Sequence, residues 1–398
     1  MEKDIISAEI VQKLFGKKEV ELRVKVVPPG RCPQCGCRRM HKHGMVKDTP
    51  VRKVLDSIVA GKLVYISWVP FRVKCPACGK TITCRPEGVQ PWARLSDNAI
   101  RAVVACLKTL NYASVADLTG LNRNRVWRLA QKHVGTGIMP ESGTPVVLTL
   151  DEASYRHNDY TCVVGELSPT KRLLTILEDD LVSTIENYLR ELKRRGVVVE
   201  AFVIDMKDAW RRAIKRVFPE AKVIVDPFHL IQDANRRLDE ARKVERDATK
   251  VSVPRYPLVK PREKLTPKER KQLDQIKHRF PALYELYQLK EDLRDIVRCN
   301  DESRAQQLLT RWLINADNAQ NAEGRVWANT IRAWRQELLN LVHFTAQGRR
   351  YTNGYIEGKI AAIKMIKRIS FGFRNRMSFI KKAFLGCCSR TEIPQLLI

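Results

Sequence analysis

The sequence has no apolar run that approaches the roughly 18 residues needed to span a lipid bilayer. Its first residues, Met-Glu-Lys-Asp, also lack the apolar stretch of a secretory signal peptide. Acidic residues are outnumbered, because 72 Lys and Arg against 44 Asp and Glu leave a formal net charge of +28. We therefore expect no membrane partner and a cytoplasmic protein that binds a polyanion, with nucleic acid favoured over lipid.

Disulfide bonds are not expected either, although the chain contains 11 Cys. The number is odd, and without a signal peptide it indicates a reducing compartment in which clustered cysteines bind metal. Six of the cysteines lie between Cys32 and Cys84. Hydrophobic residues make up 44% of the chain, which is ample for a packed core and excludes a disordered basic tail.

Two short cysteine motifs predict a zinc-binding module within residues 1–91. They are Cys32-Pro-Gln-Cys35-Gly and Cys75-Pro-Ala-Cys78-Gly. In each motif two thiolates can bind one ion, and the glycine permits the tight turn that follows. Four thiolates leave no open position, so we expect one structural zinc ion there and no catalysis. The spacing leaves open the roles of Cys37, Cys84, His41 and His43, which we interpret as bystanders.

Residues 92–140 carry the pattern of a helix-turn-helix DNA-binding domain. An amphipathic helix, a short helix, a turn at Gly120 and a further helix at 122–133 follow one another. The residues that point outward near the start of the last helix are Arg123, Asn124, Arg125 and Arg128. Such side chains read base edges or bind phosphates from a recognition helix. An ordinary helical hairpin with a basic face is the alternative.

The pattern after residue 145 predicts a mixed α/β core. The expected strands lie at 146–150, 160–167, 172–177, 197–204 and 221–225, with helices at 181–195 and 208–217. Three strands, helix, strand, helix, strand is the order of a ribonuclease-H-like fold. Residues 230–344 have helical spacing only and predict an all-helical insertion, with an exposed loop at 251–261. Near the N-terminus, residues 5–15 predict a short helix and residues 20–27 a strand.

Two aspartates close strands that this order places side by side. Asp151 follows the first strand of the core and Asp205 the fourth, so their carboxylates would meet at one edge of the sheet. Asp226 also ends a strand and is the competing second ligand, although capping a helix would explain it adequately. We interpret His229 as a hydrogen-bonding neighbour of the site or a DNA contact rather than a metal ligand.

Glu357 is the one acidic residue in the stretch 349–382, which contains ten Lys or Arg. Helical spacing puts it on one face with Lys364 and Arg368. The apolar positions on the opposite side, toward the core, are Ile356, Ile360, Ile363 and Ile366. A solvated basic helix is the alternative. With the two aspartates, Glu357 predicts a site in which two magnesium (or manganese) ions, roughly 3.5 to 4 Å apart, support phosphoryl transfer on DNA.

Several blocks resemble the ISL-three family of bacterial insertion-sequence transposases. They are Leu150-Asp151-Glu152, Ile204-Asp205-Met206, Asp226-Pro-Phe-His229 and Asn353-Gly-Tyr-Ile-Glu357-Gly-Lys, and the last continues into Lys367-Arg368-Ile-Ser-Phe-Gly-Phe-Arg374-Asn375. The cysteine motifs and the helix-turn-helix precede them in the family's order, so the resemblance covers nearly the whole chain. Two departures are modest, since Gly165-Glu166-Leu167 stands where the family often has an aspartate and Lys359 replaces a small polar residue.

The resemblance implies a DDE transposase, an α+β multidomain protein that binds the ends of an insertion sequence and catalyses metal-dependent cleavage and strand transfer. By position, the metal-binding catalytic triad would be Asp151, Asp205 and Glu357. The expected parts are the zinc-binding module at 1–91, the helix-turn-helix domain at 92–140, the ribonuclease-H-like core at 145–230, the helical insertion at 231–348, and the end of the core at 349–398.

Double-stranded DNA, both element ends and target, and further copies of the chain, at least as a dimer, are the expected partners. The DNA-binding residues expected in the last part are Lys364, Lys367, Arg368 and Arg374. Two rival functions fit some of the same residues. One is a zinc-containing helix-turn-helix regulator without catalysis, and the other is a structure-specific DNA nuclease.

Overall fold

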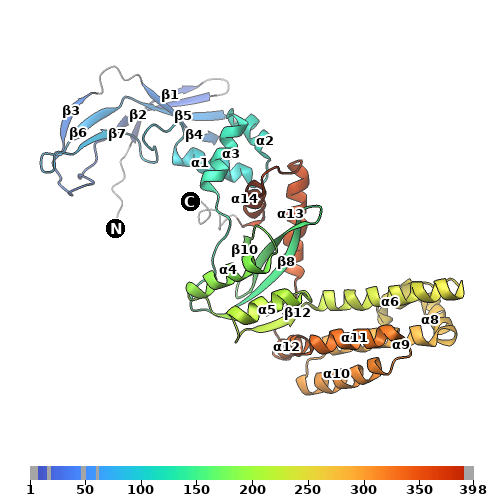
Figure 1. The fold of residues 1–398 in the computed structure, drawn as a ribbon. Coiled ribbons are helices and arrows are strands. Elements are labelled where there is room, and N and C mark those ends of the chain that lie inside the picture. Colours follow the sequence, from blue (N-terminus) through green and yellow to red (C-terminus); the bar gives the residue numbers. More distant parts are fainter. Residues whose placement is uncertain (1–7, 16–18, 46–50, 60–61, 390–398) are drawn as a thin grey trace. The chain divides into compact units, whose positions relative to one another are not determined.

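Two units make up the fold, and the structure, a computed structural model, describes residues 8–15, 19–45, 51–59 and 62–389. One unit combines residues 1–136 with residues 366–398, and the other comprises residues 137–365 (Figure 1). The expected division differs in one respect, because the part at 349–398 is shared between the units within a single helix. No helix in the described ranges is long and apolar enough to cross a membrane.

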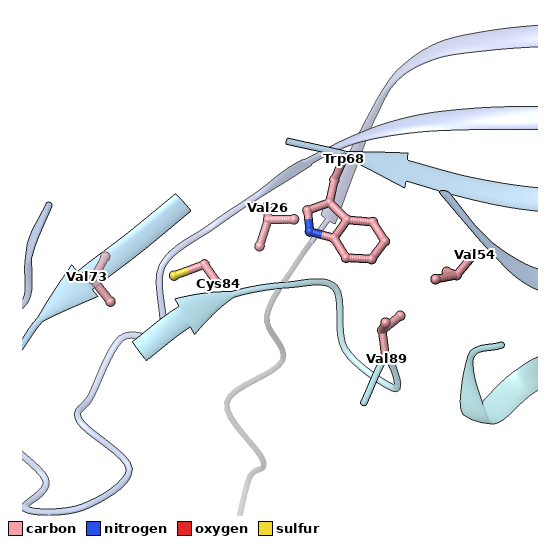
Figure 2. Packing of buried hydrophobic residues seen from close by; sticks show 6 residues of the cluster. All are labelled: Val26, Val54, Trp68, Val73, Cys84 and Val89. Carbon is pink, nitrogen blue, oxygen red and sulfur yellow. The ribbon is translucent and has the colours of Figure 1, made fainter. Parts of the chain in front are cut away.

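The N-terminal unit begins with two small sheets. The first, in the order β1-β2-β5-β4, contains β1 (Ala8–Phe15), β2 (Glu19–Val26), β5 (Lys62–Trp68) and β4 (Arg52–Val59). The second, in the order β3-β6-β7, contains β3 (His41–Met45), β6 (Phe71–Lys74) and β7 (Thr81–Cys84). Figure 2 shows a cluster of buried residues from both sheets, in which Trp68 and Val26 share a core with Val54, Val73, Cys84 and Val89.

The helix expected at residues 5–15 is wrong where the structure describes it. Residues 8–15 form β1, which pairs antiparallel with β2 from Ala8 opposite Val26 to Phe15 opposite Val20. The apolar spacing of so short a segment fits either period, and hydrogen bonding to β2 decides for a strand. Residues 5–7 lie outside the described ranges.

Three helices with polar caps follow the sheets, as the helix-turn-helix pattern predicts. They are α1 (Asp97–Leu107), α2 (Tyr112–Thr119) and α3 (Arg123–His133). Their N-termini are capped by Ser96, Asn111 and Asn122, whose side chains accept backbone N–H bonds. Gly120 ends α2 at a φ of 65°, a left-handed conformation that favours glycine, and this produces the turn between α2 and α3.

The last helix of the described chain, α14 (Arg376–Cys387), packs onto these three helices. The hydroxyl of Ser378 accepts a hydrogen bond from Trp127 Nε1 on α3 at 2.8 Å. The ammonium group of Lys382 donates to the carbonyl oxygen of Leu107 at the end of α1. These contacts explain why residues 366–398 belong with the N-terminal unit rather than with the core.

The second unit contains a five-stranded mixed sheet in the order β10-β9-β8-β11-β12. Its strands are β8 (Val146–Arg156), β9 (Asp159–Ser168), β10 (Arg172–Ile176), β11 (Val199–Ile204) and β12 (Lys222–Val225). The first three pair antiparallel, whereas β11 is parallel to both β8 and β12. With α4 (Val182–Arg194) and α5 (Asp208–Val217), the expected order of three strands, helix, strand, helix, strand is confirmed.

The first strand of this sheet is longer than expected. The prediction that it ends at Leu150, with Asp151 closing it, is wrong, because β8 continues to Arg156. β9 provides antiparallel partners for the extra residues, ending with Arg156 opposite Asp159. Asp151 therefore lies inside a strand and is fixed by backbone hydrogen bonds on both sides of it along the chain.

The residues between the sheet and α13 are helical, as expected. The helices are α6 (Pro227–Thr249), α7 (Tyr256–Val259), α8 (Pro267–Arg279), α9 (Pro281–Arg298), α10 (Glu302–Asp317), α11 (Ala322–Ala333) and α12 (Arg335–Ala346), with a 3-10 turn at Arg262–Lys264. The exposed loop expected at 251–261 is wrong in part, since it contains α7 and buries Val253 and Leu258.

A single helix, α13 (Gly354–Ile369), returns the chain to the sheet after this insertion. Its predicted apolar face is confirmed, because Ile356, Ile360, Ile363 and Ile366 are all buried. Gly165 on β9 permits a close approach, since a Cβ atom there would lie 2.9 Å from the Cδ1 atom of Ile356. The first turn of α13, which carries Glu357, is thereby held against the sheet.

Candidate active site

The first two carboxylates of the expected triad come from neighbouring parallel strands. Pairing of β8 and β11 places Thr149 opposite Val203, and two residues further along the two chains stand Asp151 and Asp205. The register thus brings both carboxylates to the same edge of the sheet. The Asp151 carboxylate also accepts a hydrogen bond from the backbone N–H of Glu152 at 2.6 Å.

Burial makes both carboxyl groups hard to ionise. Asp151 is only 9% exposed, and the loss of hydration raises its pKa to about 6. Burial, and then the nearby charges of Asp151 and Asp226, raise the pKa of Asp205 to about 7. Like charges in a poorly hydrated site repel each other, so this arrangement favours a cation at the same place.

Glu357 reaches this site from the far side of the helical insertion. His229, near the start of α6, places its Nε2 atom 3.4 Å from Asp205 Oδ1 and 3.7 Å from Glu357 Oε1. The sequence leaves open how far Asp205 lies from Glu357. In the structure one imidazole ring contacts both carboxylates. Burial, followed by the charge of Asp226, raises the pKa of Glu357 as well.

Asp226 is fully buried beside the triad and has a structural task. It caps α6, because its Oδ2 atom accepts the backbone N–H of His229 at 3.2 Å. Its Oδ1 atom accepts the backbone N–H of Asn353 at 2.9 Å, just before α13 begins. Each of Asp205, Asp226 and His229 has a ligand atom within 4.8 Å of the others, but backbone donors already use both oxygens of Asp226.

Asn353 is a positioning residue that the sequence pattern does not single out. Its Nδ2 atom donates to Asp205 Oδ1 at 3.0 Å, and its Oδ1 atom accepts from the hydroxyl of Thr149 at 2.6 Å. The side chain therefore ties β8, the end of β11 and the start of α13 together. The available signal is its place at the head of the block that contains Glu357.

The sequence pattern also does not single out a half-buried lysine at the same edge of the sheet. Lys207, two residues after Asp205, forms an ion pair with Glu152. Burial lowers its pKa to about 8, and the charge of Asp151 opposes part of that shift. Lys207 thus pairs with Glu152, and its charge also lowers the pKa of Asp151, which offsets part of the effect of burial.

Comparison with known proteins shows the family of the chain. A family model described as a transposase, of the ISL3 (ISL-three) type with a DDE site, matches residues 148–383. The matched region contains Asp151, Asp205 and Glu357 and more than half of the chain. The chain belongs to the ISL3 family of DDE transposases.

Curated relatives support this assignment over most of the chain. The transposase for insertion sequence element IS1001 of Bordetella parapertussis is 25% identical over 374 residues, which is 89% of each chain. The transposase for IS1557 of Mycobacterium tuberculosis is 26% identical over 360 residues, covering 79% of this chain and 76% of its own. The Drosophila P element transposase in a strand transfer complex covers 77% of this chain and 95% of its own, with 14% identity and a TM-score of 0.43.

The four cysteines expected to bind zinc come together in the N-terminal unit of the transposase. The sulfur atoms of Cys32, Cys35, Cys75 and Cys78 all lie within 4.8 Å of one another. Gly36 and Gly79 adopt φ values of 72° and 71°, so the tight turns attributed to the two glycines are confirmed. Backbone N–H groups of Cys78 and Ala77 lower the pKa of Cys75 to about 6, despite partial loss of hydration, which favours the thiolate.

The spare cysteines and histidines of this module stay outside the cluster, among the residues that the structure describes. Cys84 is buried in the apolar core of the two sheets, and the thiol of Cys37 contacts the carbonyl oxygen of Arg39. Neither of them, nor His41 or His43, shares the four-sulfur group.

The basic residues expected to bind DNA fall into two groups. On α3 of the transposase, Arg123, Asn124 and Arg128 are exposed and Arg125 is half-buried. On α13 and beyond, Lys364, Arg368 and Arg374 are exposed and Lys367 is half-buried. Lys364 lies in the unit that contains the triad, whereas Lys367, Arg368 and Arg374 belong to the unit that contains α3.

Proposed function

We propose that this transposase cleaves DNA at the ends of its insertion sequence and joins them to a target, with Asp151, Asp205 and Glu357 as ligands of two magnesium or manganese ions. The observation that carries the proposal has two parts: the strand register places Asp151 beside Asp205, and His229 Nε2 lies 3.4 Å from Asp205 and 3.7 Å from Glu357. A regulator that only binds DNA has no use for such a group. The core that holds it is interpreted as ribonuclease-H-like.

The residues present fit divalent cations. Carboxylate oxygens are the ligands that magnesium and manganese prefer. The pKa values of Asp151 and Asp205 are raised by burial and, for Asp205, by mutual repulsion, and both causes are relieved when a cation is bound. Asp226 is not a ligand in this proposal, because its oxygens accept two backbone N–H groups.

Each residue of the site has a distinct task in this scheme. Bound ions would supply activation of a water molecule or a DNA 3′-hydroxyl and stabilisation of the leaving oxygen. Asp151 and Asp205 hold their oxygens rigidly, since one lies inside a strand and the other is fixed by Asn353. His229 lies between Glu357 and Asp205 and contacts both carboxylates through Nε2.

The partners follow from the same chemistry. The exposed basic residues of α3 would bind element ends, and those of α13 and the following turn would bind phosphates. Two ends have to be joined in one complex, so we expect at least a dimer. We expect this activity in the cytoplasm, because the DNA of the bacterial nucleoid lies there.

Replacement of each triad carboxylate tests the proposal. Asp151→Asn, Asp205→Asn and Glu357→Gln should each reduce magnesium-dependent cleavage and joining on the order of a thousandfold or more, with DNA affinity retained. The assay combines cleavage and joining gels with a binding titration on DNA that contains the element ends. Normal joining by any of the three variants would remove that residue from the site.

Asp208→Asn is the matched control for this series. Asp208 lies three residues after Asp205 but is half-exposed and paired with Arg211 and Arg212 on α5. Its replacement should leave both activities within about twofold, because a surface ion pair contributes little. A wild-type protein that cleaves DNA but never joins it would establish the nuclease alternative.

A structural zinc ion in the N-terminal unit is the second part of the proposal. Metal analysis of the purified protein should give one zinc per chain, and Cys75→Ser should lose it together with cooperative unfolding of that unit. Cys37→Ser is the control and should retain the metal. An unchanged melting transition after removal of the metal would rule out a structural role.

A further inference from the structure

The turn between α13 and α14, residues 370–375, presents an aromatic ring to solvent. Phe371 is 95% exposed, more than any other large hydrophobic side chain among the described residues. Burying a phenylalanine stabilises a fold, and here almost none of that stabilisation is realised. The ring is therefore in place for something outside the folded chain.

The backbone at Phe371 is also unfavourable for this residue. Its φ of 55° lies in the left-handed region, where glycine is preferred and a bulky side chain is strained. The N–H of Phe371 donates to the carbonyl oxygen of Arg368, and the N–H of Gly372 donates to that of Lys367, both at 3.0 Å. These bonds close the end of α13 in the way a glycine usually does.

The second phenylalanine of the same turn shows the ordinary arrangement. Phe373 is half-buried, and its ring lies 5.6 Å from that of Phe379, which is fully buried on α14. The two phenylalanines are two residues apart in the same turn. Phe373 anchors the turn to the core, whereas Phe371 does not. Apolar anchoring therefore explains Phe373 and leaves Phe371 unexplained.

The turn is fixed to the helix-turn-helix by hydrogen bonds within one unit. Asn111, which caps α2, donates from Nδ2 to the carbonyl oxygen of Ile369 at 3.4 Å. Asn375 caps α14 through the N–H of Ser378, and Ser378 accepts from Trp127 on α3. The turn that carries Phe371 thus has a defined position beside α2 and α3, the helices expected to bind DNA.

The charge around the turn selects the partner. Residues 358–389 contain no Asp or Glu. Their basic residues are Lys359, Lys364, Lys367, Arg368, Arg374, Arg376, Lys381 and Lys382. A ring among cations is the arrangement with which proteins stack on an unpaired base while binding the neighbouring phosphates.

We propose that Phe371 stacks on a nucleobase displaced from the duplex at the element end. The inference rests on the proposed function, because it requires that the helix-turn-helix unit binds those ends. A base beside a nick has lost part of its stacking, so it is the least costly base to displace. A ring held rigidly by its helix end then replaces the lost neighbour and holds the cut strand in place.

The test measures binding of the full-length, zinc-loaded protein to two DNA probes in magnesium-free buffer. One probe is a paired duplex, and the other is the same duplex with a short thymine bulge. Phe371→Ala should weaken binding to the bulged probe about 5- to 100-fold and binding to the paired probe less than about twofold. Phe371→Tyr, which keeps a ring, should retain both affinities. Tyr256→Ala, which removes another exposed aromatic ring far along the chain, should change neither.

A second variant separates stacking from a structural role. Phe371→Gly removes the ring and also the left-handed strain, so its melting temperature should be no lower than that of wild type. It should nevertheless bind the bulged probe as weakly as Phe371→Ala does. In addition, 5-iododeoxyuridine placed in the bulge should form a photochemical crosslink to Phe371, which mass spectrometry would locate.

Three results would overturn the proposal. Equal binding of the bulged probe by wild type and Phe371→Ala would exclude stacking while leaving the transposase function intact. A change of oligomeric state in Phe371→Ala, measured by sedimentation, would assign the ring to contacts between copies of the chain. Failure of wild type to bind either DNA probe would instead refute the proposed function and this inference together.

Discussion

Two clusters of charged side chains lie within residues 137–365, and they are built in opposite ways. In the candidate active site, burial raises the pKa values of Asp151 and Asp205, and the charges of Asp151 and Asp226 raise that of Asp205 further. In the helical insertion, Glu263 and Glu291 are matched by basic side chains. Hydrogen bonds from Arg294 hold the pKa of Glu263 well below its usual range.

The insertion group is complete within the chain. Lys290 is fully buried on α9, yet its Nζ atom lies 2.7 Å from Glu291 Oε1 and donates to the carbonyl oxygens of Leu258 and Lys260. Arg294 reaches Glu263 at 2.7 Å. These bonds tie residues 258–263 to α9. The charges therefore hold parts of the helical insertion together.

The active-site group is incomplete within the chain. Its neighbouring cation, Lys207, is paired with Glu152 and offsets only part of the effect of burial on Asp151. The contrast teaches that paired buried charges serve structure, whereas an uncompensated buried cluster indicates a ligand from outside. Three measurements of the free energy of unfolding test this difference, and they follow in order of decreasing expected effect.

Lys290→Met should produce the largest loss of stability. It leaves two backbone carbonyl groups without a donor and Glu291 with one cation fewer, so the free energy of unfolding should fall by about 3 kcal/mol. Denaturant titration followed by circular dichroism measures this directly. A loss below about 1 kcal/mol would mean that the insertion charges are not structural.

Asp205→Asn should instead raise the free energy of unfolding at high pH. Because the folded-state pKa of Asp205 is raised to about 7 from 3.8, its favourable contribution is full below pH 3.8 and is lost as the pH rises through about 7. In magnesium-free buffer without chelator, the variant should be more stable than wild type by about 1 to 3 kcal/mol at pH 8. The difference should fall to about a third of that size at pH 5 and vanish below pH 3.8, and a pH-independent difference would contradict the uncompensated cluster.

Arg298→Ala should have the smallest effect. Arg298 also contacts Glu263, at 2.9 Å, but both side chains are about half exposed. Water competes for these charges, so the free energy of unfolding should change by less than about 1 kcal/mol. A loss as large as that of Lys290→Met would show that pairing, rather than burial, sets the stability of the insertion.

The sequence predicts the arrangement of the core well because local apolar patterns indicate the order of its strands and helices. The buried isoleucine face of α13 follows from helical periodicity, and the capping of α8 by Thr266 and Glu269 follows from a four-residue motif. The pairing of β8 with β11 follows from the order of strands and helices along the chain. The four-sulfur cluster follows from spacing as well.

Features that depend on distant partners could not be predicted in the same way. The extension of β8 to Arg156 and the strand at Ala8–Phe15 exist because another strand supplies hydrogen bonds. Asn353, Lys207 and Lys290 acquire their tasks from residues far away in the chain. The return of Glu357 to Asp205 likewise depends on how the whole insertion folds.

That return has a consequence for the newborn protein. About 150 residues separate Asp205 from Glu357, and at ribosomal speed their synthesis takes roughly 8 to 30 s. During this interval the nascent chain has both aspartates but not the glutamate. With the ligands proposed above, the growing chain would lack the third carboxylate of its metal site until α13 has been synthesised.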